Sequence, residues 1–248
     1  MPRLVLHYTD STLLLLEHAQ EKVVAQSLPL ETDKPFARER MSGPIKKALE
    51  SNTLQRVLWF SPNYTLFPRA LFDPNQLEAY YQLNQGELPA NQHLTNQVLA
   101  ALDLVLIYSI PVWLYDFAKY DLHTPQVQHS AALQLAHLSA QHPKDKVVLL
   151  IEATHFVLIA FKDSKLLCCT ANEYQQITDI LYFLLAHQQK LQLPQHLALD
   201  LYDASEWFDY PAFTALISQF KDFEHYICTF YDTPTYQNQI LCASSEDH

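Results

Sequence analysis

The chain has 248 residues, of which 49% are hydrophobic and 17% charged, and this composition is typical of one or two compact domains rather than of a disordered segment. Its formal net charge of −11 and the lack of lysine or arginine runs argue against binding to nucleic-acid phosphates or to an anionic membrane surface. The N-terminal residues do not resemble a signal peptide, and the longest apolar stretch falls short of the roughly 20 residues of a membrane span, so we expect a cytoplasmic protein without membrane insertion.

The chain begins with a predicted antiparallel meander. Its three strands are expected at residues 4–8, 13–17 and 22–28, which are rich in apolar residues and separated by turn-forming ones. The next stretch, 36–51, is predicted to be helical in its second part, with Ser42 as the N-cap and Pro44 at an early position. Residues 56–61, RVLWFS, then predict a fourth strand.

Residues 60–122 form an insertion with elements of its own. We expect a short strand at 64–68, a helix at 73–83, the end of a helix at 98–102, a strand at 103–110 and a helix at 111–120. Asp73 followed by Pro74 is the strongest helix start in the chain, because the Asp73 side chain can accept from free amides where proline needs no donor. A further helix at 129–141 leads to the polar link 142–145, where we place a domain boundary.

After this link the order of elements repeats. The expected elements are strands at 146–151, 155–161 and 165–171, a helix at 175–191, a strand at 196–202, a helix at 211–220 and a strand at 225–230. The second helix of this series is expected to be capped at Asp209 or Tyr210, before Pro211. We therefore predict a first half at 1–142, a second half at 143–232 and a polar tail at 233–248.

The second half reads βββαβαβ, in which hairpins join three antiparallel strands and helical crossovers add parallel ones. This is the ribonuclease H-like unit, and two such units in tandem, with extra strands and helices in the first, are the plan of the actin-like ATPase fold. The sequence resembles an uncharacterised bacterial family with this fold, found largely in the Bacteroides lineage. The resemblance covers most of the chain and rests on both meanders and on residues 57–73, 105–120 and 179–191. It implies the α/β fold and no assigned activity.

Actin-like ATPases hold phosphate at the two meander turns, where aspartate and glycine let backbone amides approach the oxygens. The corresponding turns here, residues 9–12 and 152–155, contain no glycine, and strand end 201–205 has Asp203 and Ala204 where these ATPases place a glycine pair for adenosine. The two glycines of the chain, Gly43 and Gly86, lie elsewhere. The resemblance therefore implies that the nucleotide site is lost, with no catalytic residue and no cofactor.

We accordingly expect a non-catalytic pseudo-ATPase that acts as a scaffold through protein–protein contacts, either with an unidentified partner or as a homodimer. The cleft between the halves and the insertion are the expected binding surfaces. Aromatic residues crowd the insertion, and we take Tyr64, Phe67 and Trp113 as partner contacts because tyrosine and tryptophan are enriched at interfaces. The same residue types are also common in protein cores.

The alternative is a divergent ATPase that binds Mg·ATP between the two halves. In that case Asp10, Ser11, Thr12 and Thr154 replace the usual glycine loops, because Asp-Ser-Thr can still hold a cation and a phosphate. The ordinary role of such residues is a polar hairpin turn.

No metal site is expected. Asp200, Asp203, Glu206 and Asp209 are spaced three apart, but Asp200 falls in a predicted strand and the series lacks a calcium-loop glycine. The twelve histidines include no His-Glu-x-x-His pair, and the four cysteines include no Cys-x-x-Cys pair, so we expect free thiols.

Overall fold

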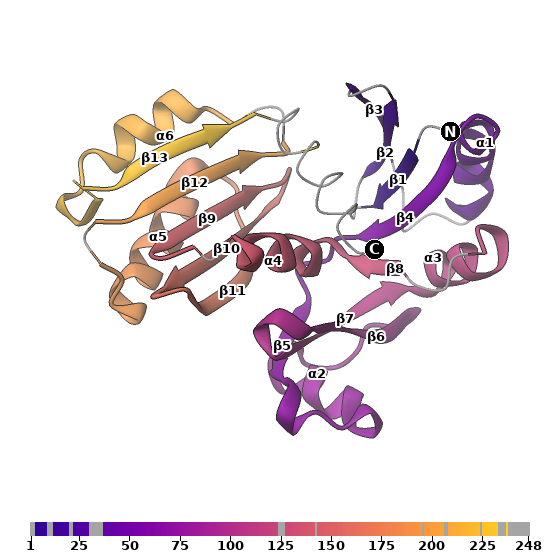
Figure 1. Ribbon diagram of the computed structural model, residues 1–248, viewed down its shortest axis with the longest axis horizontal. Coiled ribbons are helices and arrows are strands. Elements are labelled where there is room, and N and C mark those ends of the chain that lie inside the picture. Colours follow the sequence, from indigo (N-terminus) through magenta and orange to yellow (C-terminus); the bar gives the residue numbers. More distant parts are fainter. Residues whose placement is uncertain are drawn as a thin grey trace. The chain divides into compact units, whose positions relative to one another are not determined.

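The computed structural model describes residues 3–8, 12–19, 22–29, 37–123, 127–141, 143–194, 196–205, 208–223, 225–232 and 237. The chain forms two compact units, one containing residues 1–137 with Gln237, and the other containing residues 138–236 (Figure 1). We call them unit 1 and unit 2.

The main sheet of unit 1 has five strands in the order β3-β2-β1-β4-β8. The strands are β1 (Arg3–Tyr8), β2 (Thr12–Ala19), β3 (Lys22–Pro29), β4 (Thr53–Trp59) and β8 (Val127–His129). The first three pair antiparallel as predicted, whereas β1 with β4 and β4 with β8 pair parallel. The ribonuclease H-like order of strands is therefore present, with the insertion between β4 and β8.

Helix α1 (Ala37–Leu49) connects β3 to β4 and is longer than predicted. It begins before Ser42, so the prediction that Ser42 is its N-cap was wrong, and Pro44 lies inside the helix. A proline at this position removes one amide donor, and the following residues continue the helix because Ile45 is fully buried and anchors it to the sheet.

The insertion contains a separate three-stranded antiparallel sheet in the order β5-β7-β6. Its elements are β5 (Tyr64–Pro68), the short 3-10 turns Arg69–Leu71 and Pro74–Gln76, α2 (Leu77–Gln85), β6 (Gln92–Leu99), the 3-10 turn Ala100–Leu102, β7 (Leu104–Pro111), α3 (Val112–Asp116) and a π-helical turn Phe117–Asp121. Asp73 does cap the turn before α2, and its carboxylate accepts from the Asn75 amide. Strand β6 was not predicted. The end of this strand and the 3-10 turn Ala100–Leu102 occupy residues 98–102, where the end of a helix was expected.

One face of the small sheet packs against α2 through a compact apolar cluster. Its buried members are Tyr81, Val105 and Ile107, and Phe67 and Tyr80 pack against them. The insertion therefore has a core of its own, which lets it stand as a folded extension of unit 1.

Unit 2 repeats the strand order of unit 1, as β11-β10-β9-β12-β13. Its elements are β9 (Lys146–Ile151), β10 (His155–Lys162), β11 (Lys165–Glu173), α5 (Ile177–Leu191), β12 (Ala198–Asp203), α6 (Tyr210–Ile217), the 3-10 turn Lys221–Phe223 and β13 (Ile227–Tyr231). Helix α4 (Ser130–Ala140) follows β8 and contains the point at which unit 1 ends and unit 2 begins.

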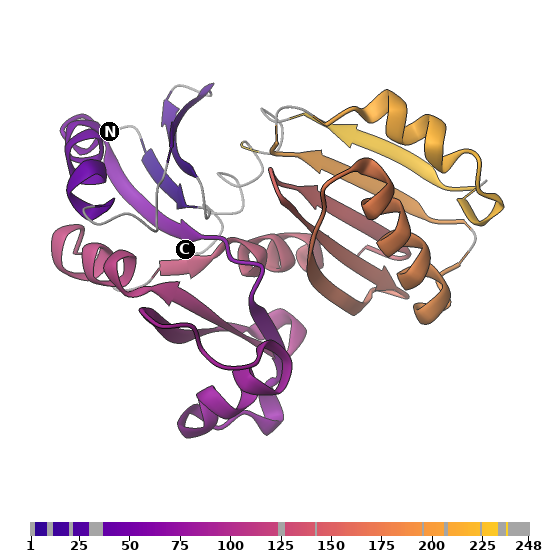
Figure 2. The ribbon, with the colours of Figure 1, turned by 180° about the vertical axis from the view of Figure 1, so that it is seen from behind.

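Helices α5 and α6 cover one face of the unit 2 sheet, as Figure 2 shows. The odd-numbered residues of β9 and β12, such as Leu149 and Leu201, point into this core and meet Leu184 and Phe213 of the two helices. Helix α6 begins at the predicted place, because the Asp209 carboxylate accepts from the Ala212 amide and Pro211 occupies the first turn. Among the described residues, no helix is both long and apolar enough to cross a membrane.

Candidate functional site

The second meander turn, between β9 and β10 of unit 2, is the described counterpart of a phosphate loop. Its backbone groups bond to one another: the Glu152 amide donates to the His155 carbonyl at 2.8 Å, and the Tyr174 amide donates to the Thr154 carbonyl at 3.1 Å. The Tyr174 hydroxyl also donates to the Glu152 carbonyl at 2.7 Å. The first bond closes the turn, and the two bonds from Tyr174 tie it to the end of β11.

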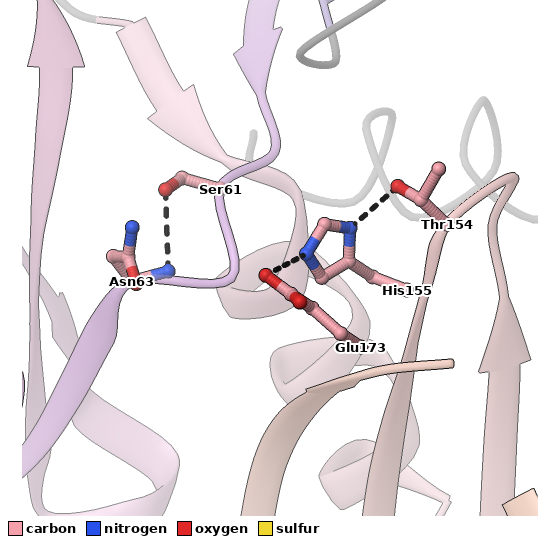
Figure 3. A network of polar contacts seen from close by, with 5 residues as sticks. All are labelled: Ser61, Asn63, Thr154, His155 and Glu173. Atoms are coloured by element: carbon pink, nitrogen blue, oxygen red, sulfur yellow. Dashed lines mark hydrogen bonds and ion pairs between the residues drawn. The ribbon is translucent and has the colours of Figure 1, made fainter. Parts of the chain in front are cut away.

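A chain of polar side chains crosses the same turn, and Figure 3 shows it at close range. Thr154 Oγ1 lies 2.8 Å from His155 Nδ1, and His155 Nε2 lies 3.6 Å from Glu173 Oε1. In the tautomer that accepts the Thr154 hydroxyl at Nδ1, the ring proton sits on Nε2 and points toward the Glu173 carboxylate. Because the Glu173 side chain is 87% exposed, this pair contributes little to stability.

The end of β12 lies beside this turn, and its amide and hydroxyl donors are also hydrogen-bonded to neighbouring protein groups. The Ala204 amide donates to the Ile151 carbonyl at 2.8 Å, and the Asp203 carboxylate accepts from both the Ser205 amide at 2.8 Å and the Ser205 hydroxyl at 2.5 Å. Asp203 is buried. An aspartate turn thus occupies the place where a glycine pair would have opened space for an adenosine.

Negative charge gathers around the Tyr174 hydroxyl. Burial raises the pKa of the Tyr174 phenol, and the nearby carboxylates of Asp203 and Glu152 raise the pKa further. Together with Glu173, which lies beside His155, the carboxylates of Asp203 and Glu152 make three acidic groups near this turn. The turn itself contains no glycine. A phosphate placed here would meet like charges, and the Glu152 amide already donates within the turn.

The arrangement also gives no indication of a metal centre. Within the described part of the chain, no group of three or more histidine, cysteine, aspartate or glutamate side chains is placed to hold a metal ion. Of the acidic series, Asp200 pairs with Lys146 inside the sheet at 2.5 Å, Asp203 accepts from Ser205, and Asp209 caps α6, whereas Glu206 lies outside the described residues.

The first meander turn falls largely outside the described residues. Asp10 and Ser11 lie outside them, and Thr12 is described only as the first residue of β2, without its side chain. Thr154, the fourth residue assigned to the nucleotide alternative, bonds to His155. The strand that leads into the first turn ends with His7 and Tyr8, which are both fully buried.

The three residues predicted to contact a partner lie in three different environments. Tyr64 is buried and packs its ring 5.1 Å from that of His129, and Phe67 stacks on Tyr80 at 4.1 Å in the α2 cluster. Trp113 is half-buried, and its ring meets that of Tyr8 edge to face, with 6.1 Å between the ring centroids. The structure therefore does not bring them together on one exposed surface.

A buried histidine network in unit 1 was missed by the sequence reasoning. His129 ends β8, and its Nδ1 accepts from the Ala131 amide at 3.2 Å, while its Nε2 lies 3.0 Å from the Ser61 carbonyl. Ser61 in turn orders the loop after β4, because its hydroxyl accepts from the Asn63 amide at 3.2 Å (Figure 3). Complete burial lowers the pKa of His129 to about 3, so the ring is neutral. Because Nδ1 accepts from Ala131, the proton lies on Nε2, which has both the carbonyl of Ser61 at 3.0 Å and its amide at 3.3 Å as neighbours and donates to the carbonyl.

Comparison with known proteins gives a family and a fold. A family described as "Protein of unknown function (DUF3822)" matches residues 13–204. A solved Bacteroides thetaiotaomicron VPI-5482 protein with actin-like ATPase fold and unknown function shares 16% identity, with a TM-score of 0.76 over 97% of this chain and 95% of that chain. The structure of a PilM–PilN type IV pilus biogenesis complex shares 15% identity, with a TM-score of 0.55 over 95% of this chain and 89% of that chain. No curated protein matches the sequence significantly.

At these identities the structural likeness shows the fold alone. The fold predicted from the two meanders, an actin-like ATPase fold built from duplicated ribonuclease H-like halves, is confirmed.

Proposed function

Because the chain belongs to the DUF3822 family, which is described as of unknown function, and has the actin-like ATPase fold, we propose that it is a non-catalytic pseudo-ATPase that acts as a scaffold through protein–protein contacts. The proposal includes a cytoplasmic location, which the free thiols of Cys168, Cys169 and Cys228 favour.

The closed turn of unit 2 carries this proposal. A phosphate site needs backbone amides that converge on empty space and a local excess of positive charge. At residues 152–155 the Glu152 amide is bonded inside the turn, and the carboxylates of Glu152, Glu173 and Asp203 surround it. These contacts support a scaffold that keeps the fold of an actin-like half without its phosphate site.

A role in protein contacts is supported by two observations. The PilM–PilN structure shows that a chain with a similar fold takes part in a complex with another protein. In this chain the insertion exposes large apolar side chains, with Leu71 at 69% and Leu83 at 76% exposure. Exposed apolar side chains of this size are available for contact with a partner protein.

Nucleotide titration of the full chain tests the proposal. Thermal-shift and calorimetric titrations with Mg·ATP and Mg·ADP are expected to give no saturable change, because a ligand of the native state must raise the melting temperature by mass action. ATP hydrolysis, followed as released phosphate, is expected to stay at the level of the buffer.

The variant Asp10→Ala separates this proposal from the ATPase alternative. A saturable, magnesium-dependent shift that Asp10→Ala abolishes would overturn the pseudo-ATPase and assign Asp10, Ser11, Thr12 and Thr154 to Mg·ATP. Asp103→Asn is the matched control, because Asp103 is exposed and has a left-handed backbone, with φ of 53°, that asparagine also accepts.

A further inference from the structure

The outer strand of the unit 1 sheet, β3, has one edge that pairs with no other described strand. Strand β3 pairs with β2 on one side and is the last strand of the sheet on the other. Residues 24–27 are exposed, including Val24 at 58%. Edge strands are usually blocked by a charge, a proline or a bulge, and β3 has a lysine and a proline only at its two ends, Lys22 and Pro29. Residues 23–28 between them contain no charge, proline or bulge, and no described strand pairs with their outer side, so this stretch can pair with another extended segment.

A groove runs beside this edge, between β3 and helix α1. It has a volume of about 480 Å³, which lies within the range of ligand pockets. It is lined by Glu17, Gln26, Leu28, Gly43, Pro44, Lys47, Ala48 and Ser51. Gln26 and Leu28 alternate along β3 and so point to the same side of the sheet, the side that α1 covers. We call this space the α1–β3 groove.

Two charged side chains, Glu17 and Lys47, line the groove. No ion pair joins Glu17 or Lys47 to another side chain in the described part of the chain. Leu28, Pro44 and Ala48 supply apolar wall between them. Lys47 lies in the basic last turn of α1 together with Lys46, so a lysine lines the groove on the α1 side and Glu17 lines it on the sheet side.

We propose that the α1–β3 groove is the docking site of the scaffold, and that it binds an extended segment of a partner protein which pairs with the edge of β3. The segment places an aliphatic side chain against Leu28, Pro44 and Ala48 and a carboxylate beside Lys47. The added segment forms hydrogen bonds with the backbone of β3. Alternate side chains of the segment enter the groove, which gives the binding its specificity. This inference rests on the proposed function and names the kind of partner that it requires.

Gly43 offers a way to close the groove without disturbing the fold. A side chain added at Gly43 meets no atom within 4 Å, and replacing a helical glycine favours the helix. Gly43→Trp is therefore expected to fill the groove mouth and keep or raise the melting temperature. Ala79→Trp, on the exposed face of α2, is the matched control for adding an indole.

The probe is a peptide selected from a random phage-displayed library on the full-length protein, then synthesised with a fluorophore. We expect its affinity to fall at least about tenfold with Gly43→Trp and with Lys47→Glu. Ala79→Trp and Lys46→Glu, which changes the neighbouring exposed lysine, are expected to leave it unchanged. Peptides methylated at one backbone nitrogen each are expected to bind more weakly when the methyl group lies on every second residue. In a paired strand only alternate amides donate to the neighbouring strand.

Three results would overturn the inference. Peptides that bind wild type and Gly43→Trp equally would move the docking site elsewhere and leave the scaffold proposal intact. A uniform effect of N-methylation would exclude strand pairing. A dimer in light-scattering chromatography that Gly43→Trp converts to monomer would show that a second copy, not another protein, occupies β3. The scaffold proposal itself would be contradicted by a different result, a nucleotide-dependent shift in the melting temperature.

Discussion

The imidazole of His129 caps helix α4, because its Nδ1 accepts from the amide of Ala131 at 3.2 Å. Histidine is an unusual N-cap, and here its other nitrogen is used as well, since Nε2–H points at the Ser61 carbonyl 3.0 Å away. One buried ring thereby joins the end of β8, the start of α4 and the loop after β4.

Replacing His129 by leucine is expected to lower the free energy of unfolding by about 2–4 kcal/mol, because it removes the cap and leaves the Ser61 carbonyl without its donor. His129→Asn is expected to recover about 1 kcal/mol of this, since asparagine also caps helices. Urea unfolding measures both. His225→Leu, at an exposed histidine, is the control, and an equal loss there would remove the special role of His129.

Acid should destabilise the protein through His7. This side chain is fully buried, neither ring nitrogen has a hydrogen-bond partner in the described structure, and burial lowers the pKa of His7 to about 4. The pKa of an unfolded histidine is about 6.5, so between pH 7 and pH 5 His7 gains a proton in the unfolded state but stays neutral in the native state. Stability is therefore full above pH 6.5 or so and falls as the pH drops toward 4, by roughly 2 kcal/mol between pH 7 and pH 5 for this one group.

The variant His7→Leu checks this pH dependence. It is expected to reduce the difference in free energy of unfolding between pH 7 and pH 5 by roughly 2 kcal/mol, without loss at pH 7, because leucine leaves no unsatisfied nitrogen in the core. An unchanged pH dependence in His7→Leu would mean that the ring gains a proton in the native state.

The ion pair between Lys146 and Asp200 links neighbouring strands of the unit 2 sheet. Their charged atoms are 2.5 Å apart, and the Asp200 side chain is 5% exposed. Lys146→Met is expected to cost about 3 kcal/mol, because it leaves a carboxylate buried without its partner. The double change with Asp200→Leu should restore much of this. Lys165→Met, at an exposed lysine of β11, is the control and should stay within about 0.5 kcal/mol of wild type.

The cap of α6 gives a fourth prediction. Asp209→Ala removes the acceptor of the Ala212 amide, whose bond to the carboxylate is 2.9 Å long, and is expected to cost about 1 kcal/mol. Asp209→Ser keeps an acceptor and should lose a few tenths of a kcal/mol. Equal losses in the two variants, measured by urea unfolding, would show that the carboxylate acts through its charge and not as a cap.

The sequence predicts the elements with strong local signals. Asp73 and Asp209 could be identified as caps because an acceptor followed by proline is a signal contained in two or three residues. Strand β6 escaped prediction because it is an edge strand of mostly polar, half-exposed residues, without the alternation that marks a buried strand. Helix α1 begins earlier than predicted because burial of its later residues outweighs the local signal of Pro44.

The candidate site shows a different limit. The turn Asp163–Ser164 joins β10 to β11 with φ of 50° and 64°, and counting back from it would place Asn172 opposite His155. A bulge between Ala160 and Phe161 shifts the pairing by one residue, so that Glu173 faces His155 instead. No local sequence pattern predicts this bulge, so the contacts between Thr154, His155 and Glu173 could not be derived from sequence spacing.

Helix α4 is shared between the two units, since unit 1 ends at His137 and unit 2 begins at Leu138, both inside the helix. Fragments made by cutting the chain at this division would end in the middle of a helix and expose Leu135 and Leu138, which are now buried. Limited proteolysis should for the same reason spare this junction while α4 is folded, because proteases need an extended backbone. A fragment designed to contain either unit alone would therefore need a complete copy of α4.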